Sequence, residues 1–155
     1  MSDITTIGIA GIGVVKAPDS IRTVLGSCVG IVLYDRKART GAMGHVILPS
    51  SAEGVGDPGK FADTALDLLL EEMVKAGATR QNLSAKIAGG ARMFGAASTS
   101  GLGDRNVVAV KNCLENRHVP LLAEHCGGGK GRKITLDPST GALAVQIIGM
   151  EPTTI

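Results

Sequence analysis

An apolar run, CVGIVLYD, occupies residues 28–35 and consists mostly of valine, isoleucine and leucine. Its length and β-branched content are typical of a buried strand. A polar segment follows, and a second apolar run, AMGHVILP, extends over residues 42–49 and ends at a proline. The pattern predicts a β-hairpin that any fold of this chain must accommodate.

Strand and helix patterns alternate irregularly along the rest of the chain. Helix spacing is clearest over residues 60–77, with an apolar residue every fourth position and Gly77 as its stop. A second helix is expected over residues 103–119, with Asp104 as its cap. Short strand segments are expected within residues 5–15, a strand that enters a Gly-Gly turn within 83–94, and further strands over 21–25, 121–126, 132–137 and 142–149. This order predicts a mixed α+β domain rather than regular βαβ units.

Composition narrows the class of protein. A length of 155 residues predicts one domain spanning residues 1–155, and 44% hydrophobic residues suffice for a core. The net charge of +2 is spread over interspersed acids and bases, and only 2% of the residues are aromatic. A basic stripe with stacking aromatics, typical of nucleic-acid binding, is absent from the sequence. We therefore expect no nucleic-acid partner.

The cysteines and the N-terminal segment indicate a cytoplasmic protein. The three cysteines, Cys28, Cys113 and Cys126, lie far apart without a CxxC pair, which argues against disulfides and structural zinc. No lysine or arginine precedes the N-terminal apolar run, and no run approaches the ~20 residues of a membrane span. We expect a reducing compartment and no membrane insertion.

Known cofactor and metal motifs do not match. The glycines of GIAGIG (8–13) and CGGGKGRK (126–133) have the wrong spacing for dinucleotide or Walker A loops, so we expect turns there. The three histidines, His45, His118 and His125, form no H-x-x-x-H or HExxH pattern. A metal site would need ligands gathered from distant segments, and none is predicted.

Cys28 follows a Gly-Ser pair at which the backbone can bend, so its thiol could face solvent as a nucleophile. In the predicted hairpin, His45 lies near the same end and could serve as its base if the strand register allows. Free cysteines are also common core residues, and a buried thiol with a satisfied core histidine is the alternative. Cys113 is expected in the core, and Cys126, beside His125, is the rival nucleophile.

Several stretches together resemble the CheD family of chemoreceptor glutamine deamidases. They are TVLGSCVGIVLYD, GAMGHVILP, ALDLLLEEMVKAGATRQNLSAKIAGGARMF, GDRNV and GGGKGRKITLDPSTGALAV, in that order. The resemblance extends over about residues 7–147. It implies packed, mostly antiparallel β-sheets, sandwich-like and flanked by two main helices, similar to the catalytic domain of cytotoxic necrotising toxins.

The resemblance also implies an activity and a site. Family members hydrolyse side-chain amides of specific glutamines on methyl-accepting chemotaxis receptors to glutamate and ammonia, and some act on methyl esters. By motif position, Cys28 is the nucleophile, His45 the base and Thr23 the third member. Backbone N–H groups around Ser27 and Val29 would stabilise the oxyanion of a path through a thioester. No cofactor or metal is implied, and a CheC phosphatase is an expected partner.

Two other functions remain open from the sequence. A non-catalytic adaptor would bind a CheC-type phosphatase or a receptor without using the thiol. A cysteine peptidase or other acyl-transfer enzyme would share the cysteine and histidine and differ only in substrate. His125-Cys126 has no assigned role.

Overall fold

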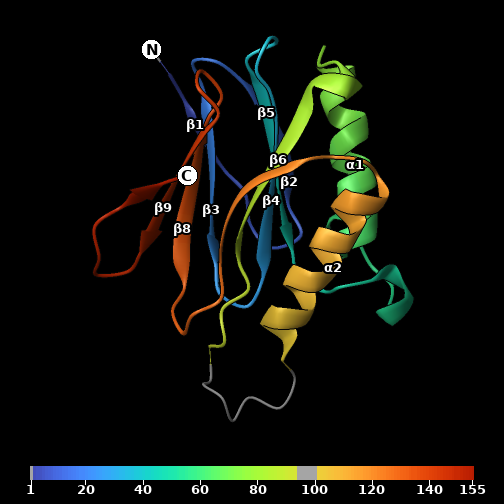
Figure 1. Ribbon diagram of the computed structural model, residues 1–155, viewed down its shortest axis with the longest axis vertical. Helices are drawn as coiled ribbons and strands as arrows, with labels where there is room; N and C mark the ends of the chain where they lie inside the picture. Colours follow the sequence, from blue (N-terminus) through green and yellow to red (C-terminus); the bar gives the residue numbers. More distant parts are fainter. Residues whose placement is uncertain (1, 94–100) are drawn as a thin grey trace.

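Two five-stranded β-sheets pack face to face, and both helices cover the outer face of one sheet (Figure 1). The computed structural model describes residues 2–93 and 101–155. The first sheet has the strand order β1-β3-β8-β9-β10 and the second has β2-β5-β4-β6-β7. Among the described strands, pairing is antiparallel except between β1 and β3 and between β6 and β7. The expected α+β class with mostly antiparallel sheets is confirmed.

The element bounds follow the sequence expectations closely. The strands are β1 (Ile4–Thr6), β2 (Ile12–Lys16), β3 (Ser20–Leu25), β4 (Val29–Asp35), β5 (Thr40–Val46), β6 (Leu83–Gly89), β7 (Leu121–Cys126), β8 (Arg132–Asp137), β9 (Ala142–Ile147) and β10 (Thr153–Thr154). The helices are α1 (Ala62–Lys75) and α2 (Leu102–Asn116), with single 3₁₀ turns η1 (Ser51–Glu53), η2 (Pro58–Lys60) and η3 (Arg80–Asn82). In the segment 83–94, where a strand entering a Gly-Gly turn was expected, the strand ends at Gly89 and residues 90–93 are not in a strand, while residue 94 lies outside the described residues.

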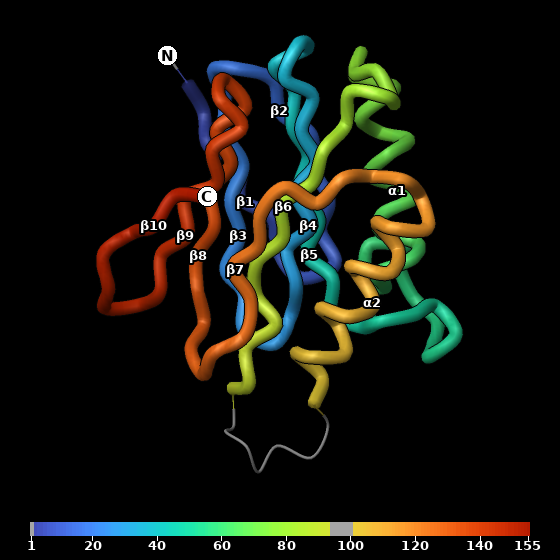
Figure 2. The backbone as a smooth tube through the Cα atoms, in the orientation of Figure 1, coloured from blue at the N-terminus to red at the C-terminus, as the bar shows by residue number. Residues whose placement is uncertain are grey.

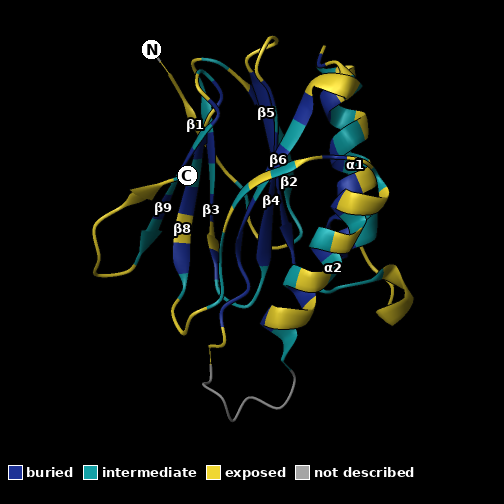
Figure 3. Cartoon of the chain, in the orientation of Figure 1, coloured by how far each residue is buried: buried dark blue, intermediate teal, exposed yellow. Residues whose placement is uncertain are grey.

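The predicted hairpin forms the centre of the second sheet. β4 and β5 pair antiparallel from Val29↔Val46 to Asp35↔Thr40. Every residue of β5 is buried, and so is every residue of β4 except Tyr34 (Figure 3). Burial on both faces explains the continuous apolar run, because one face meets the helices and the other meets the first sheet.

Two apolar clusters correspond to these two faces. Ile31 and Leu33 of β4 join a cluster with both helices, whereas Val32 joins a cluster with the first sheet. Successive side chains of a strand point to opposite faces, so one apolar strand can serve both clusters. Side chains that share a face with Val32 therefore lie between the two sheets.

The ends of the helices differ in detail from the expectations. Phe61 is buried but lies one residue before α1 rather than within it. The helix ends at Lys75, and Gly77 follows with a φ of 101°, as expected of its stop. The assignment of Asp104 as the cap of α2 is wrong. Gly101 precedes the helix in a left-handed conformation, and Asp104 lies in the first turn, where it pairs with Arg92.

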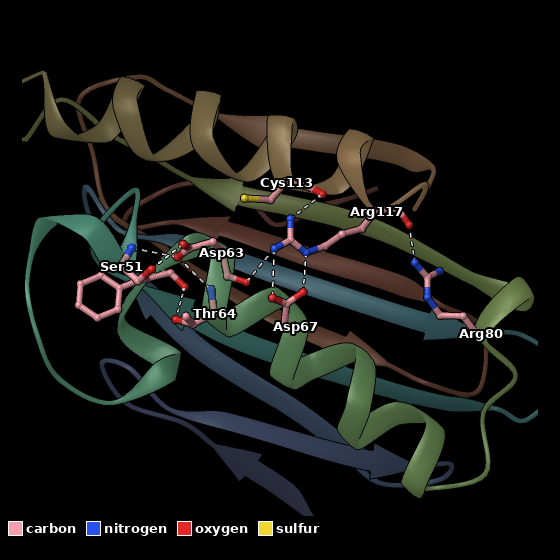
Figure 4. A network of polar contacts seen from close by, with 8 residues as sticks. Ser51, Asp63, Thr64, Asp67, Arg80, Cys113 and Arg117 are labelled. Carbon is pink, nitrogen blue, oxygen red and sulfur yellow. Dashed lines mark hydrogen bonds and ion pairs between the residues drawn. The ribbon is translucent and has the colours of Figure 1, made fainter.

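The two helices are joined by polar contacts at the C-terminal end of α2 (Figure 4). The guanidinium of Arg117 donates to both carboxylate oxygens of Asp67 on α1, at 2.6 and 3.1 Å. It also donates to the backbone carbonyls of Cys113 and Asp63. A forked contact of this kind fixes the orientation of one helix on the other.

Within the described ranges, neither helix is long and apolar enough to cross a membrane.

Candidate active site

The segment from Gly26 to Cys28 is a bend that carries the chain from one sheet to the other. β3 ends at Leu25 in the first sheet, and β4 begins at Val29 in the second (Figure 2). The expected strand therefore begins one residue later than Cys28. The bend proposed from the Gly-Ser pair is present, and it is the point at which the chain changes sheets.

The end of β6 holds this bend in place. The backbone N–H of Gly90 donates to the Cys28 carbonyl at 2.8 Å, and that of Ala91 donates to the Gly26 carbonyl at 3.0 Å. Gly89 comes so close that a Cβ there would lie 2.2 Å from the Cys28 carbonyl oxygen, and its φ is 109°. The Gly-Gly pair therefore allows the strand to turn while its backbone still supports Cys28.

The Cys28 thiol is half-buried at the edge of the cluster between the sheets. Burial raises the pKa of this thiol above its ordinary value, and its own backbone N–H partly offsets the effect. A thiol in such surroundings is protonated at neutral pH. It needs a base to act as a nucleophile.

His45 lies on the face of β5 that meets the first sheet, and Cys28 packs against the cluster on that side of the second sheet. Gly30 is the residue directly opposite His45, and Cys28 precedes Gly30 by two positions. Cys28 and His45 therefore lie near the same end of the β4–β5 hairpin, and their pairing stays a prediction. The residue directly opposed to His45 is therefore Gly30 and not Cys28, which lies in the bend before the strand.

Thr23 reaches His45 from the other sheet. Its Oγ1 lies 2.8 Å from Nδ1 of His45, and both side chains are buried. Gly30, opposite His45, allows this approach, because a Cβ there would lie 2.6 Å from Cδ1 of Ile134 in the first sheet. The hydrogen bond therefore joins β3 and β5 through the interior.

The Thr23 contacts determine which nitrogen of His45 carries the proton. Oγ1 of Thr23 donates its single proton to the Ile7 carbonyl at 2.8 Å, because that carbonyl can only accept. Nδ1 of His45 must then donate to Oγ1, which places the imidazole proton on Nδ1. Nε2 of the neutral ring keeps its lone pair and can accept a proton.

Burial lowers the pKa of His45 below its ordinary value. The imidazole is therefore neutral at neutral pH, as Cys28 is a neutral thiol. Such a pair can perform acyl transfer, since a neutral imidazole is able to take a thiol proton when the sulfur attacks a carbonyl.

The other two cysteines lie in different surroundings. Cys126 packs against the cluster on the helix side of the second sheet, and burial followed by the charge of Glu124 raises its pKa to about 11. Cys113 packs against the same cluster, and burial raises its pKa. Cys113 was expected in the core, and the structure places it half-buried against the edge of that cluster. Nothing in these contacts supplies Cys126 with a base.

Arg132 gives the His125-Cys126 segment a structural role. Its side chain is buried and donates to Nδ1 of His125 at 2.8 Å, to the carbonyl of His125 at 2.7 Å and to the carbonyl of Gly127. Gly127 and Gly128 both have positive φ angles. The arginine therefore braces the glycine turn between β7 and β8, and Nδ1 of His125 is occupied by this contact.

Ser27 and Val29 have distinct positions beside Cys28. Val29 is fully buried, begins β4 and pairs with both Val46 and Gly89. The carbonyl of Ser27 accepts a hydrogen bond from the side-chain amide of Asn106 at 3.2 Å. Asn106 and the Ile7 carbonyl were not anticipated, because contacts between distant segments leave no periodic signal in the sequence.

Among the described residues, no group of three or more potential ligands could hold a metal ion.

Comparison with known proteins identifies relatives over nearly the full chain. A family model described as CheD chemotactic sensory transduction matches residues 47–147. Chemoreceptor glutamine deamidase CheD of Halalkalibacterium halodurans is 46% identical in an alignment of 155 positions that covers 96% of each chain. Two proteins named probable chemoreceptor glutamine deamidase CheD are also similar to this chain. The one from Syntrophomonas wolfei is 46% identical with 96% of each chain aligned, and the one from Clostridium botulinum is 43% identical with 93% of each chain aligned.

Proposed function

The chain belongs to the CheD family, and we propose that it is a protein-glutamine deamidase acting on chemoreceptors. The names of its relatives supply the substrate class, a glutamine side chain on a chemoreceptor. The observation that best supports the chemistry in this chain is the Thr23–His45 hydrogen bond, which puts the imidazole proton on Nδ1 and keeps the lone pair of Nε2 available to accept a proton. We further propose that residues 1–155 act as one domain in the cytoplasm.

The first half of the proposed reaction forms a thioester. Nε2 of His45 takes the thiol proton of Cys28 while the sulfur attacks the amide carbon. Backbone N–H groups of Ser27 to Val29 receive the developing oxyanion, and a donor of this kind contributes about 3 kcal/mol in comparable sites. The imidazolium then protonates the amide nitrogen, the carbon–nitrogen bond breaks, and ammonia leaves.

The second half regenerates the thiol. His45 removes a proton from water as the water oxygen attacks the thioester carbon. The carbon–sulfur bond breaks, the sulfur regains a proton from the imidazolium, and the receptor retains a glutamate. Thr23 holds the ring in the same tautomer through both halves, since its hydroxyl proton is committed to Ile7. The receptor surface gains one negative charge for each amide converted.

Incubation of the purified chain with a receptor cytoplasmic fragment in ¹⁸O-labelled water tests the proposed function. We expect specific receptor glutamines to become glutamates that contain one solvent oxygen, with stoichiometric release of ammonia. Peptide mass spectrometry measures the conversion and its position. An unchanged receptor, together with retained binding of a CheC-type phosphatase, would instead assign the chain the role of an adaptor.

Thr23→Val tests the orientation of the imidazole. Valine has nearly the same shape as threonine but cannot accept the Nδ1–H of His45. We expect kcat to fall about 10- to 100-fold, because a hydrogen bond to a group that becomes charged contributes about 1.5–3 kcal/mol. Thr23→Ser keeps the hydroxyl and serves as the control. Equal kcat values for the valine and serine variants would contradict this role.

The pH dependence follows from the lowered pKa of His45. A protonated imidazole cannot act as a base, so we expect kcat/KM to fall on the acid side with a midpoint below 6.5, the ordinary value for histidine. The stability of the fold should also decrease as the pH falls. Between the lowered pKa and 6.5 the unfolded chain binds the extra proton, so the free energy of unfolding decreases as the pH falls. An acid limb centred above 6.5 would contradict a buried neutral base.

A further inference from the structure

Asn106 is a fully buried polar residue that links the two segments carrying Cys28 and His45. It lies in α2, and its side-chain nitrogen donates to the carbonyl of Ser27 at 3.2 Å and to that of Ile47 at 3.1 Å. Ser27 immediately precedes Cys28, and Ile47 is two residues after His45. The two N–H protons of one amide group therefore connect the bend that carries Cys28 to the residue that follows β5.

The start of α2 is pressed against the same part of the fold. Gly103 has no room for a side chain, because a Cβ there would lie 2.6 Å from the carbonyl oxygens of both Gly90 and Ala91. Gly90 and Ala91 are the residues whose N–H groups hold the carbonyls of Cys28 and Gly26. The first turns of α2 therefore meet the bend that carries Cys28 both through the two residues after β6 and directly through Asn106.

The amide of Asn106 is only half satisfied. Its Oδ1 is buried and has no hydrogen-bond partner among the described residues. A buried acceptor without a partner destabilises a fold, so a side chain selected for stability alone would not be expected here. The two donated bonds, rather than the side chain as a whole, account for an asparagine at this position.

We propose that Asn106 is a positioning residue that sets the separation of Cys28 from His45. The inference rests on the proposed pairing of these two side chains in the deamidase reaction. Asn106 acts through backbone carbonyls and does not touch the substrate, so its loss should lower kcat and leave KM unchanged. A small displacement of reacting groups costs up to about 100-fold in rate, and we expect kcat to fall about 10- to 100-fold.

Asn106→Leu is the primary variant, since leucine has a similar shape and removes both the two donors and the unpartnered Oδ1. Asn106→Ser is a second variant, which keeps a small polar group too short to reach both carbonyls. Val110→Ala is the matched control, because Val110 is a fully buried residue one turn further along α2. It should lower the unfolding temperature without lowering kcat.

A double-mutant cycle on the alkylation rate of Cys28 by iodoacetamide separates positioning from a general structural effect. Its second variant is His45→Asn, which can still donate to Thr23 but has no Nε2. We expect either Asn106 variant to slow alkylation about tenfold when His45 is present and to have no effect in the His45→Asn background. Equal slowing in both backgrounds would overturn the positioning role. A loss of kcat in Val110→Ala as large as that in the Asn106 variants would overturn it as well. Alkylation that is insensitive to His45→Asn would instead overturn the proposed Cys28–His45 pair.

Discussion

Replacing Cys28 by alanine is expected to abolish ammonia release from receptor and to leave the fold intact. The sulfur of Cys28 forms the bond to carbon in the proposed thioester. Its removal should lower kcat by on the order of 10⁴-fold or more. The side chain is small and only half-buried at the edge of the cluster between the sheets, so the unfolding temperature should stay close to that of the parent. A coupled ammonia assay and thermal unfolding measure the two quantities.

Cys126→Ala is the matched control for that variant. Its thiol has a pKa of about 11 and packs on the helix side of the second sheet, away from the face that carries His45. We expect full deamidase activity from it. The opposite result, activity in Cys28→Ala and none in Cys126→Ala, would transfer the nucleophile to Cys126.

His45→Asn is expected to lower kcat about 10²- to 10⁴-fold, the usual contribution of a general acid–base group. The asparagine amide can occupy the position of Nδ1 and donate to Thr23, so the link between the two sheets is retained. What is lost is Nε2, the proposed acceptor of the Cys28 proton. Steady-state kinetics and thermal unfolding distinguish this loss from a loss of structure.

His118→Asn is a suitable companion, because His118 lies in the turn between α2 and β7 and has no part in the proposed reaction. It should retain the parent activity. Unchanged kcat in His45→Asn would contradict the assignment of His45 as the base, even if Cys28 proved essential.

The local parts of the fold were predictable because each one leaves a periodic signal. The hairpin of β4 and β5 follows from two apolar runs around a polar turn, and its pairing is observed from Val29↔Val46 onward. The helix over Ala62–Lys75 follows from apolar residues at every fourth position. These patterns reflect side-chain burial within one element, which is what a sequence records directly.

The connection at Gly26–Cys28 could be predicted only in part. Glycine and serine indicate a bend, but no local signal says that the chain leaves one sheet and enters another there. Sheet membership depends on pairing with segments more than a hundred residues away, such as Thr23↔Ile134 between β3 and β8. The contact of Thr23 with His45 is a consequence of that packing.

The remaining site features depend on backbone groups and on distant segments. The Ile7 carbonyl fixes the tautomer of His45, yet any residue type at position 7 would supply a carbonyl. Asn106 lies 79 positions from Ser27, and its neighbours in the sequence predict only an amphipathic helix. Asp104 was misassigned as a cap for a related reason. Gly101 precedes the helix in a left-handed conformation, and no side chain caps its first turn.

Interception of the reaction by hydroxylamine tests the covalent role of Cys28 most directly. A thioester between Cys28 and the receptor is open to attack by hydroxylamine, which would leave a glutamyl hydroxamate on the receptor in place of glutamate. We predict that hydroxamate forms at the converted glutamines with the parent protein and with Cys126→Ala, and that none forms with Cys28→Ala. Conversion to glutamate with no hydroxamate at any hydroxylamine concentration, or hydroxamate formed by Cys28→Ala, would contradict catalysis through a Cys28 thioester.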